Sequence, residues 1–490
     1  MTLRYFGAVL AGLLLFWTSP AKADVSFSHA IAPILLKRCT GCHGERSSQG
    51  GYRAHNFQSL LKAGASGTAP IVAGRPAESL LFQRIVTRVE PIRMPKSDDP
   101  LSPAQIALIR QWIAEGAKCD AADKAAPLKS LLGPREHPAS PAVYRSAVPV
   151  MAIAFVPGGK EIAVGGYYEV TVWNVETGAL VRRWQHLPER IQALAFSRDG
   201  RTLLVGGGTP GEYGEVSLVD TATGQRSTVL DTFNDIVLTA AFSPDGKRIA
   251  AGSADAAVRV YDTLARKRIW SANVHSDWVT GVSFSFYGQF VASSSRDMTV
   301  KVYEADTGSL YTTYNGHNRQ IGKYQGHSPV YAVQFAPDKL LAYSAGGGQW
   351  IQVWNPVQVK AESGDAGDME ERFAKQSHTQ YIPHGFTKDV FGLLVRGDRI
   401  FATSADGLVK QFDPGTLSSV RTFQGHTDWV FALDYDPAAH RLTTGAYNGE
   451  IRIWDTQTGQ ALLSFTAQPG HEKRTAALTA LPGQKRGNSR

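Results

Sequence analysis

Five consecutive residues near the N-terminus have types and a spacing that can do chemistry together. The run Cys39-Thr40-Gly41-Cys42-His43 holds two thiols three positions apart, with an imidazole directly after the second. Thiols at this spacing can each add to a vinyl group of one haem, and the imidazole can then reach the iron from one face. The sequence therefore predicts one covalent haem c, attached through Cys39 and Cys42, with His43 as an axial ligand of the iron.

Two other chemistries also use a pair of cysteines at this spacing. A structural zinc site needs a second ligand pair with finger-like spacing, and a thioredoxin-like redox pair needs a neighbouring βαβ pattern. The sequence contains neither pattern and has only one further cysteine, Cys119. We expect Cys119 to be a buried, inert thiol, with pairing between two chains as the alternative in an oxidising compartment.

A haem that shuttles electrons needs a second axial ligand, and a methionine thioether raises the reduction potential by favouring ferrous iron. Met94 lies in the proline-flanked run Ile92-Arg93-Met94-Pro95-Lys96, 51 residues after His43 and between two predicted helices. A core methionine usually lies on a helical stripe, whereas this one lies in a loop. We therefore expect Met94 to be the distal ligand of the iron. His29, His55 and an open position are the alternatives.

Helices have to position these groups. Ile31, Ile34 and Leu35 form an apolar stripe that runs directly into the cysteine motif. Further along, Ser102-Pro103-Ala104-Gln105 has the form of a capping box with proline at the first helical position. The apolar stripe that follows it ends before Gly116 and consists of Ile106, Ile109, Trp112 and Ile113. We expect both helices to build the core of a small all-α domain over residues 24–119.

Several short runs occur in a set order between about residues 27 and 118. They include Gly50-Gly51-Tyr52-Arg53, the segment Val72–Leu81, Arg93-Met94-Pro95 and the segment Trp112–Ala117. In these runs the segment resembles the planctomycete-type cytochrome c domain, a monohaem module of bacterial envelope proteins. The resemblance implies His43 and Met94 as the axial pair, and it offers no role for Cys119.

The first 23 residues have the organisation of a cleavable signal peptide. Arg4 gives a positive start, residues 6–17 are apolar, and Ala21-Lys22-Ala23 fits an A-x-A cleavage site. About a dozen apolar residues are short for a membrane span, so an uncleaved anchor is the less favoured alternative. We expect a periplasmic mature chain that begins at Asp24 and has no transmembrane segment.

The remainder of the chain repeats itself. An apolar or aromatic residue followed by an acid or amide recurs at intervals of 46, 42, 42, 51, 58 and 42 residues. The pairs are Trp173-Asn174, Val219-Asp220, Tyr261-Asp262, Tyr303-Glu304, Trp354-Asn355, Phe412-Asp413 and Trp454-Asp455. A second apolar strand and a Gly-containing turn lie upstream of most pairs, and this period is typical of repeat architectures.

Residues 145–468 resemble the WD40 β-propeller family in these repeats. The resemblance implies an all-β propeller, for which we expect seven blades, with six or eight as alternatives. Residues 120–144 are rich in proline and alanine and are predicted to be a linker, and residues 469–490 are predicted to be a disordered tail.

The resemblance also assigns a role to several propeller histidines. Gly316-His317, Gly326-His327 and Gly425-His426 fit the Gly-His element of the family, and three residues fit its polar turn position: Asp297, Asp406 and Asn448. In that family such groups form a buried hydrogen-bond network that locks each blade, so we expect these histidines to be structural rather than metal ligands or bases.

A long polar insertion separates the fifth and sixth repeats, at about residues 356–385. It contains six residues that could serve a site: Asp365, Asp368, Glu370, Glu371, His378 and His384. Loops on a rigid scaffold often carry function, but an acidic, glycine-containing insertion is also typical of a mobile surface loop. We favour the loop interpretation.

These features predict an exported c-type cytochrome that transfers electrons through a His/Met-ligated haem. We expect the propeller to dock a redox protein partner, which would contact both the haem edge and the propeller. The alternatives are an oxidoreductase with its catalytic centre on the propeller and a haem-based sensor. We identify no catalytic residue. The net charge of +8 is modest for this length, and the basic residues are dispersed except near the C-terminus, without a basic stripe interleaved with aromatics, so we expect no nucleic-acid partner.

Overall fold

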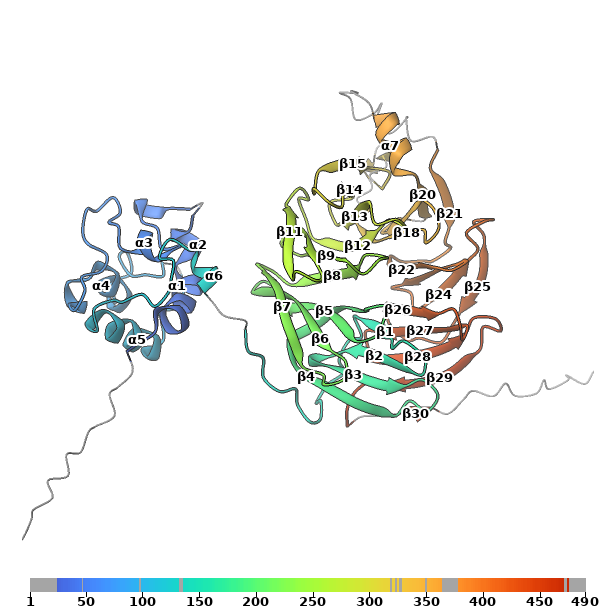
Figure 1. The fold of residues 1–490 in the computed structure, drawn as a ribbon, viewed down its shortest axis with the longest axis horizontal. Helices are drawn as coiled ribbons and strands as arrows, with labels where there is room; N and C mark the ends of the chain where they lie inside the picture. The colour runs from blue at the N-terminus through green and yellow to red at the C-terminus, as the bar shows by residue number, and fades with distance from the viewer. Residues whose placement is uncertain are drawn as a thin grey trace, which may run out of the picture. The chain divides into compact units, whose positions relative to one another are not determined.

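The computed structural model describes residues 24–470, apart from 46, 97, 132–134, 318–319, 322–323, 326–327, 349 and 364–377, together with 474–475. The chain divides into two compact units, residues 1–135 and residues 136–490. The first is helical and the second is built from antiparallel sheets (Figure 1). The predicted signal peptide and most of the predicted tail lie outside the described residues.

The first unit consists of short helices, as the sequence predicts. Its α-helices are α1 (Ala32–Arg38), α2 (Thr40–His43), α3 (Phe57–Leu60), α4 (Leu80–Val86), α5 (Pro103–Ala114) and α6 (Leu128–Leu131). A π-helix, η1 (Phe27–Ile31), precedes α1, and two 3₁₀ turns, η2 (Gln49–Gly51) and η3 (Pro76–Glu78), lie in the connections.

The capping box predicted for α5 is present. The Ser102 hydroxyl accepts a hydrogen bond from the Gln105 amide at 3.2 Å, and the Gln105 side chain accepts one from the Ser102 amide at 2.9 Å. The helix buries Ile109, Trp112 and Ile113 in the core of the unit, which confirms the predicted stripe. The core is aromatic at its centre, because the Trp112 ring packs 5.4 Å from that of Phe27 and 6.4 Å from that of Phe57.

The described part of the predicted linker is divided between the two units. Asp120 accepts a hydrogen bond from the Ser28 amide at 2.9 Å, and Leu128 on α6 is fully buried in the core of the first unit. His137 and Tyr144 are buried in the second unit, where they contact glutamates of β-strands. Much of the Pro/Ala-rich segment is therefore packed against one unit or the other.

The second unit begins with a seven-stranded sheet in the order β1 to β7. Its strands are β1 (Ile153–Phe155), β2 (Glu161–Gly165), β3 (Tyr167–Asn174), β4 (Leu180–Phe196), β5 (Thr202–Thr209), β6 (Tyr213–Asp220) and β7 (Arg226–Phe233). The long strand β4 pairs with β3 through its first part and with β5 through its second part. Two four-stranded repeats thus share strand β4, which joins them in one seven-stranded sheet.

Each later repeat forms its own sheet. Three of them contain β8 (Val237–Phe242), β9 (Arg248–Ser253), β10 (Val258–Asp262) and β11 (Lys267–Ala272); β12 (Val279–Phe284), β13 (Phe290–Ser295), β14 (Val300–Glu304) and β15 (Leu310–Tyr314); and β18 (Val330–Phe335), β19 (Ala342–Gly346), β20 (Trp350–Trp354) and β21 (Gln380–Pro383). A small hairpin, β16 (Gln320–Ile321) and β17 (Tyr324–Gln325), precedes the third of these.

The last two sheets follow the insertion. They contain β22 (Val390–Arg396), β23 (Arg399–Ser404), β24 (Val409–Phe412) and β25 (Ser419–Phe423), and then β26 (Val430–Asp436), β27 (Arg441–Ala446), β28 (Glu450–Asp455), β29 (Ala461–Thr466) and β30 (Arg474–Thr475). The insertion starts with a helix that was not predicted from the sequence, α7 (Pro356–Ser363), and the four acidic residues that were predicted as site candidates lie outside the described residues.

The sheets close into a ring, as a propeller requires (Figure 1). The first strands of successive repeats contact one another in the series β1, β4, β8, β12, β18, β22 and β26, and β26 contacts β1 again. At this closure the Phe155 amide donates to Asp434 at 2.7 Å, and the Trp173 ring packs 5.3 Å from Phe465. The predicted fold class is confirmed.

Candidate haem-binding site

The cysteine motif lies at the end of the first helix. The Cys39 carbonyl accepts a hydrogen bond from the His43 amide at 2.9 Å, so α2 is one helical turn that starts where α1 stops. The Thr40 hydroxyl donates to the Leu36 carbonyl at 2.7 Å and ties this turn to α1. One turn of helix therefore presents both thiols and the imidazole.

The two thiols of the motif differ in environment. Both are free, Cys39 is half-buried against the core of the first unit, and Cys42 is exposed. Burial raises the pKa of the Cys39 thiol to about 11. Neither sulfur atom forms a disulfide, so both are available for covalent addition to the vinyl groups of a haem.

The His43 imidazole is oriented by the loop that follows it. Its Nδ1 lies 3.3 Å from the Tyr52 carbonyl oxygen, and its ring packs 5.3 Å from the Tyr52 ring. The Ala54 amide donates to the His43 carbonyl at 2.7 Å, which holds the loop against the motif. With Nδ1 directed to a carbonyl, Nε2 is the nitrogen that remains for an iron ligand.

Met94 is half-buried in the loop after α4, and its amide donates to the Arg84 carbonyl at 2.9 Å. The competing histidines have other polar neighbours. His29 is exposed and its Nδ1 lies 2.8 Å from the Ser28 hydroxyl, while the two ring nitrogens of His55 lie 3.2 Å from the Asn56 side-chain amide and 3.4 Å from the Ser59 hydroxyl. These contacts favour Met94 over the two histidines as the distal ligand of the iron, and this role stays a prediction.

Two further observations fit a haem at this site. Large apolar side chains are exposed in the segment that leads to Met94: Val86 by 43%, Val89 by 56% and Ile92 by 42%. The Nε of Arg38, next to Cys39, is buried and has no acceptor among the described residues. A porphyrin, with an apolar ring and polar carboxylates, can satisfy surroundings of both kinds.

The part of the chain that the structure describes contains no group of three or more His, Cys, Asp or Glu residues placed to hold a metal ion. Among the same residues, no helix is long and apolar enough to cross a membrane.

The two Gly-His histidines that the structure describes, His317 and His426, lie in buried hydrogen-bond networks, as expected. His317 is buried, with Nε2 2.8 Å from the Ser344 hydroxyl, which also accepts from the Trp354 indole at 3.0 Å. Burial lowers the pKa of His317 to about 3. The interpretation of the insertion as a mobile surface loop is wrong at His384, which follows strand β21, is buried, and has its Nε2 2.8 Å from the Gly348 carbonyl. His327 lies outside the described residues.

The network around His426 departs from the predicted turn position. Its Nε2 lies 2.8 Å from the Thr444 hydroxyl, which accepts from the Trp454 indole at 2.8 Å. Its Nδ1 lies 2.9 Å from the carboxylate of Glu450, not from Asn448. Burial would raise the pKa of Glu450, but the contacts with His426 and Arg452 outweigh it and lower that pKa to about 2.

One further histidine of this kind was not predicted from the sequence. His275 lies 2.8 Å from the Asp297 carboxylate through Nδ1 and 2.7 Å from the Ser293 hydroxyl through Nε2. Valine instead of glycine precedes it, so the Gly-His signal is absent. The spacing to Asp297, already recognised as a polar turn residue, was the remaining signal.

Two buried glutamates were missed as well. Glu215 on β6 is fully buried, accepts from the Arg226 guanidinium at 2.8 Å, and lies 3.0 Å from Nε2 of His137. Glu169 on β3 is also fully buried, with the Tyr144 hydroxyl donating to it at 2.5 Å and the Arg183 Nε at 2.6 Å. The segment before β1 thus completes polar networks in the first two repeats.

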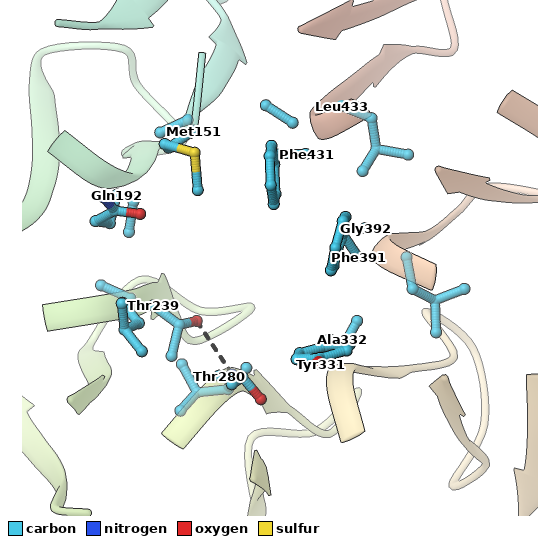
Figure 2. Close-up of a pocket in the computed structure, with 18 of the residues that line it drawn as sticks. Met151, Gln192, Thr239, Thr280, Tyr331, Ala332, Phe391, Gly392, Phe431 and Leu433 are labelled. Carbon is cyan, nitrogen blue, oxygen red and sulfur yellow. Dashed lines mark hydrogen bonds between the residues drawn. The ribbon is translucent and has the colours of Figure 1, made fainter. Parts of the chain in front are cut away.

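A channel of about 200 Å³ lies at the centre of the propeller ring, and the first strand of every repeat lines it (Figure 2).

A group of aromatic side chains lies at one side of this channel. Phe391 and Phe431 have stacked rings 4.6 Å apart. The Trp429 ring lies 5.9 Å from Phe391 and 6.1 Å from Tyr447, and Trp429 and Tyr447 are exposed by 45% and 50%. We call this connected set of rings the aromatic patch: Tyr331, Phe391, Trp429, Phe431 and Tyr447.

Comparisons with known proteins agree with both units. Residues 39–98 match the model of the planctomycete cytochrome C family. Residues 224–262, 266–304, 318–355 and 417–455 match the WD domain, G-beta repeat. The chain therefore joins a planctomycete-type cytochrome c domain to a series of WD40 repeats. A cytochrome c domain implies haem, and WD40 repeats generally mediate protein interactions.

Curated relatives resemble the chain as WD-repeat proteins. WD repeat-containing protein 1 of Xenopus tropicalis is 24% identical over 354 residues, which is 70% of this chain and 54% of that protein. A guanine nucleotide-binding protein subunit beta of Oryza sativa subsp. indica is 23% identical over 287 residues, 58% of this chain and 57% of that protein. The subunit of the same name in Zea mays is 32% identical over 92 residues, 18% of this chain and 24% of that protein. The chain thus spans from about a quarter to just over half the length of these relatives.

Proposed function

We propose that this protein is an exported monohaem cytochrome c that transfers electrons, and that its propeller docks a redox protein partner. The proposal rests on the geometry of the helical turn that carries the cysteine motif, α2. Two cysteines without a disulfide and an imidazole, whose Nδ1 is directed to the Tyr52 carbonyl, lie on one helical turn. In this proposal Cys39 and Cys42 hold one haem covalently, and His43 and Met94 are its axial ligands.

The bound haem would supply a one-electron couple between ferric and ferrous iron. The protein's own groups do the rest. The Tyr52 carbonyl fixes the orientation of His43 and makes its imidazole a stronger donor. The hydrogen bond from the Met94 amide to the Arg84 carbonyl anchors the loop that carries the thioether. The exposed Val89 and Ile92 side chains are available to exclude water from the ring.

The docking role is supported by the aromatic patch. Monomeric proteins seldom expose a connected apolar patch, and aromatic side chains are enriched at protein interfaces. Aspartates lie near its residues in the sequence: Asp389 directly precedes β22, and Asp277 and Asp428 each lie two residues before the start of β12 and of β26. We infer that a protein partner with apolar and basic side chains docks there.

Mass and optical spectra test the haem. The mature holoprotein should begin at Asp24 and carry a mass increase of a single haem. Met94→Ala should replace the six-coordinate low-spin spectrum by one that responds to carbon monoxide, whereas Met151→Ala, which changes a methionine of the propeller channel, should not. A sulfur-to-iron charge-transfer band that persists in Met94→Ala would show that another group is the ligand.

The aromatic patch is tested by a matched pair of variants. Trp429→Ala should weaken complex formation with the partner by at least about tenfold, because a buried aromatic anchor contributes about 2 kcal/mol or more. Leu264→Ala removes an apolar side chain that is 94% exposed on a turn between β10 and β11, and it should leave binding unchanged. If the partner binds the two variants with equal affinity, the aromatic patch is not part of the docking surface.

We also propose seven blades for the propeller. The central channel is lined by seven strands, one from each repeat, and strand β4 serves two neighbouring repeats. Export is supported by the cytochrome type and by the predicted signal peptide, and the N-terminal residue of the mature protein tests it.

A further inference from the structure

A polar hollow lies in the cytochrome unit beside the loop that orients His43. Its volume is about 570 Å³, and cationic and neutral hydrogen-bonding side chains line it: Arg53, His55, Asn56, Gln58, Ser59 and Lys62. Its described lining includes no carboxylate and no apolar side chain larger than alanine. A ligand that fits these walls must offer negative charge and hydrogen-bond acceptors.

The two cations of the hollow are available to such a ligand. Arg53 and Lys62 are exposed, and neither side chain forms an ion pair or a hydrogen bond with another described residue. The Arg53 guanidinium presents paired donors in a planar fork that matches a carboxylate, and the Lys62 ammonium adds a compact charge.

The backbone around the hollow is held in place. The Ala65 amide donates to the Gly50 carbonyl at 2.7 Å, and a Cβ at Gly64 would lie 2.7 Å from the same oxygen, so the two segments are too close for a side chain there. On the other side, the Gln58 amide donates to the Lys124 carbonyl at 3.1 Å. The cations are thus mounted on a fixed frame, which lowers the entropy cost of binding.

The same loop connects the hollow with the haem motif. Ser48 lines the hollow and pairs with His43 through a β-bridge. Arg53 lies between Tyr52, whose carbonyl faces the imidazole, and Ala54, whose amide donates to the His43 carbonyl. A charge bound at Arg53 therefore acts on the loop that orients the iron ligand.

Long-range electrostatics favour an anion as well. Residues 24–135 contain 15 Lys and Arg against 9 Asp and Glu, a net charge of +6, whereas residues 136–490 contain 34 of each and are neutral. The positive charge of the mature chain is thus concentrated in the cytochrome unit, where it raises the local concentration of anions.

We propose that this hollow is a carboxylate-binding site that is coupled to the haem. The carboxylate has two possible sources, a small dicarboxylate from solution or a propionate of the haem itself, and the second source rests on the proposed function. Either source places a negative charge against Arg53 and Lys62.

Calorimetric titration of succinate into the full-length holoprotein at constant ionic strength tests the first source, and it does not depend on redox activity. Saturable binding is expected, weakened at least about tenfold by Arg53→Gln or Lys62→Gln, since a charge-assisted hydrogen bond is lost. Arg110→Gln makes the same charge change at an exposed position on α5, outside the hollow, and should bind succinate as the wild type does.

The reduction potential tests the second source. If a propionate fills the hollow, succinate does not bind, and Arg53→Gln lowers the potential and increases its dependence on pH more than Arg110→Gln does. The proposal is overturned if succinate binds equally to all three variants, or if it does not bind and Arg53→Gln and Arg110→Gln have the same potential at every pH. If the chain acquires no haem when it is co-expressed with a haem-attachment system but still binds succinate through Arg53, the proposed function alone is refuted.

Discussion

The buried pair of His137 and Glu215 joins the start of the second unit to strand β6, and His137→Ala measures how much this contact stabilises the propeller. Both side chains are almost completely buried, with exposed fractions of 1% and 0%. Burial alone would raise the pKa of Glu215, but the hydrogen bond from His137 and the charge of Arg226 outweigh it and hold the pKa below its usual value. The carboxylate is therefore charged in the folded protein and needs its partners.

The expected cost follows from what remains after the substitution. Removing one partner of a buried charge pair costs about 3–5 kcal/mol when the other charge is left alone. In His137→Ala the carboxylate keeps Arg226 at 2.8 Å and the Ser217 hydroxyl at 2.9 Å, so only one hydrogen bond to a charged group is lost. We expect a loss of about 2–3 kcal/mol in the free energy of unfolding of the second unit.

Urea unfolding followed by tryptophan fluorescence is a suitable assay. Eight of the ten tryptophans lie in residues 136–490, so the signal reports mainly on the propeller. A double-mutant cycle with Glu215→Gln separates the pair from other effects of each substitution. The reasoning is refuted if the coupling energy of the pair is below about 0.5 kcal/mol, or if His137→Ala unfolds with the wild-type midpoint.

Further predictions concern the propeller and the haem motif. His317 has a folded pKa of about 3, far below its unfolded value, so the unfolded state binds a proton that the folded state does not between about pH 6.5 and pH 3. Stability should therefore fall as the pH falls through this window, and the pH dependence of the unfolding free energy should be shallower in His317→Gln; identical slopes would contradict it. Tyr144→Phe should cost about 1–3 kcal/mol, because the buried Glu169 loses the hydrogen bond from the Tyr144 hydroxyl, and urea unfolding checks this. His43→Ala should give no stable holoprotein when co-expressed with a haem-attachment system, which absorbance at the Soret band checks against the Arg110→Gln control. Gly207→Ala should destabilise the first sheet by at least about 2 kcal/mol, since its Cβ would lie 2.2 Å from the Arg190 carbonyl; wild-type stability would contradict that packing.

The features that the sequence determined by itself are local in the chain. The cysteine motif, the capping box of α5 and the recurring strand-end pairs each lie within a few residues, where spacing alone fixes which groups share a turn or a strand. For that reason both domain types could be predicted, and the structure and the comparisons confirm them. The structural roles of His317 and His426 could also be predicted, since the Gly-His element is a local signal.

Tertiary structure decided the contacts between residues far apart in the chain. Glu215 lies 78 positions from His137, and no periodicity links the two residues. The packing of the segment before β1 against the first sheet could therefore not be predicted from the sequence. The choice of Glu450 over Asn448 as the partner of His426 depends on which side chain reaches the buried nitrogen after strand pairing. The aromatic patch likewise exists only because the packing of consecutive repeats around the channel places strands β18, β22 and β26 side by side. Burial and long-range proximity are products of the closed ring, and a linear pattern does not contain them.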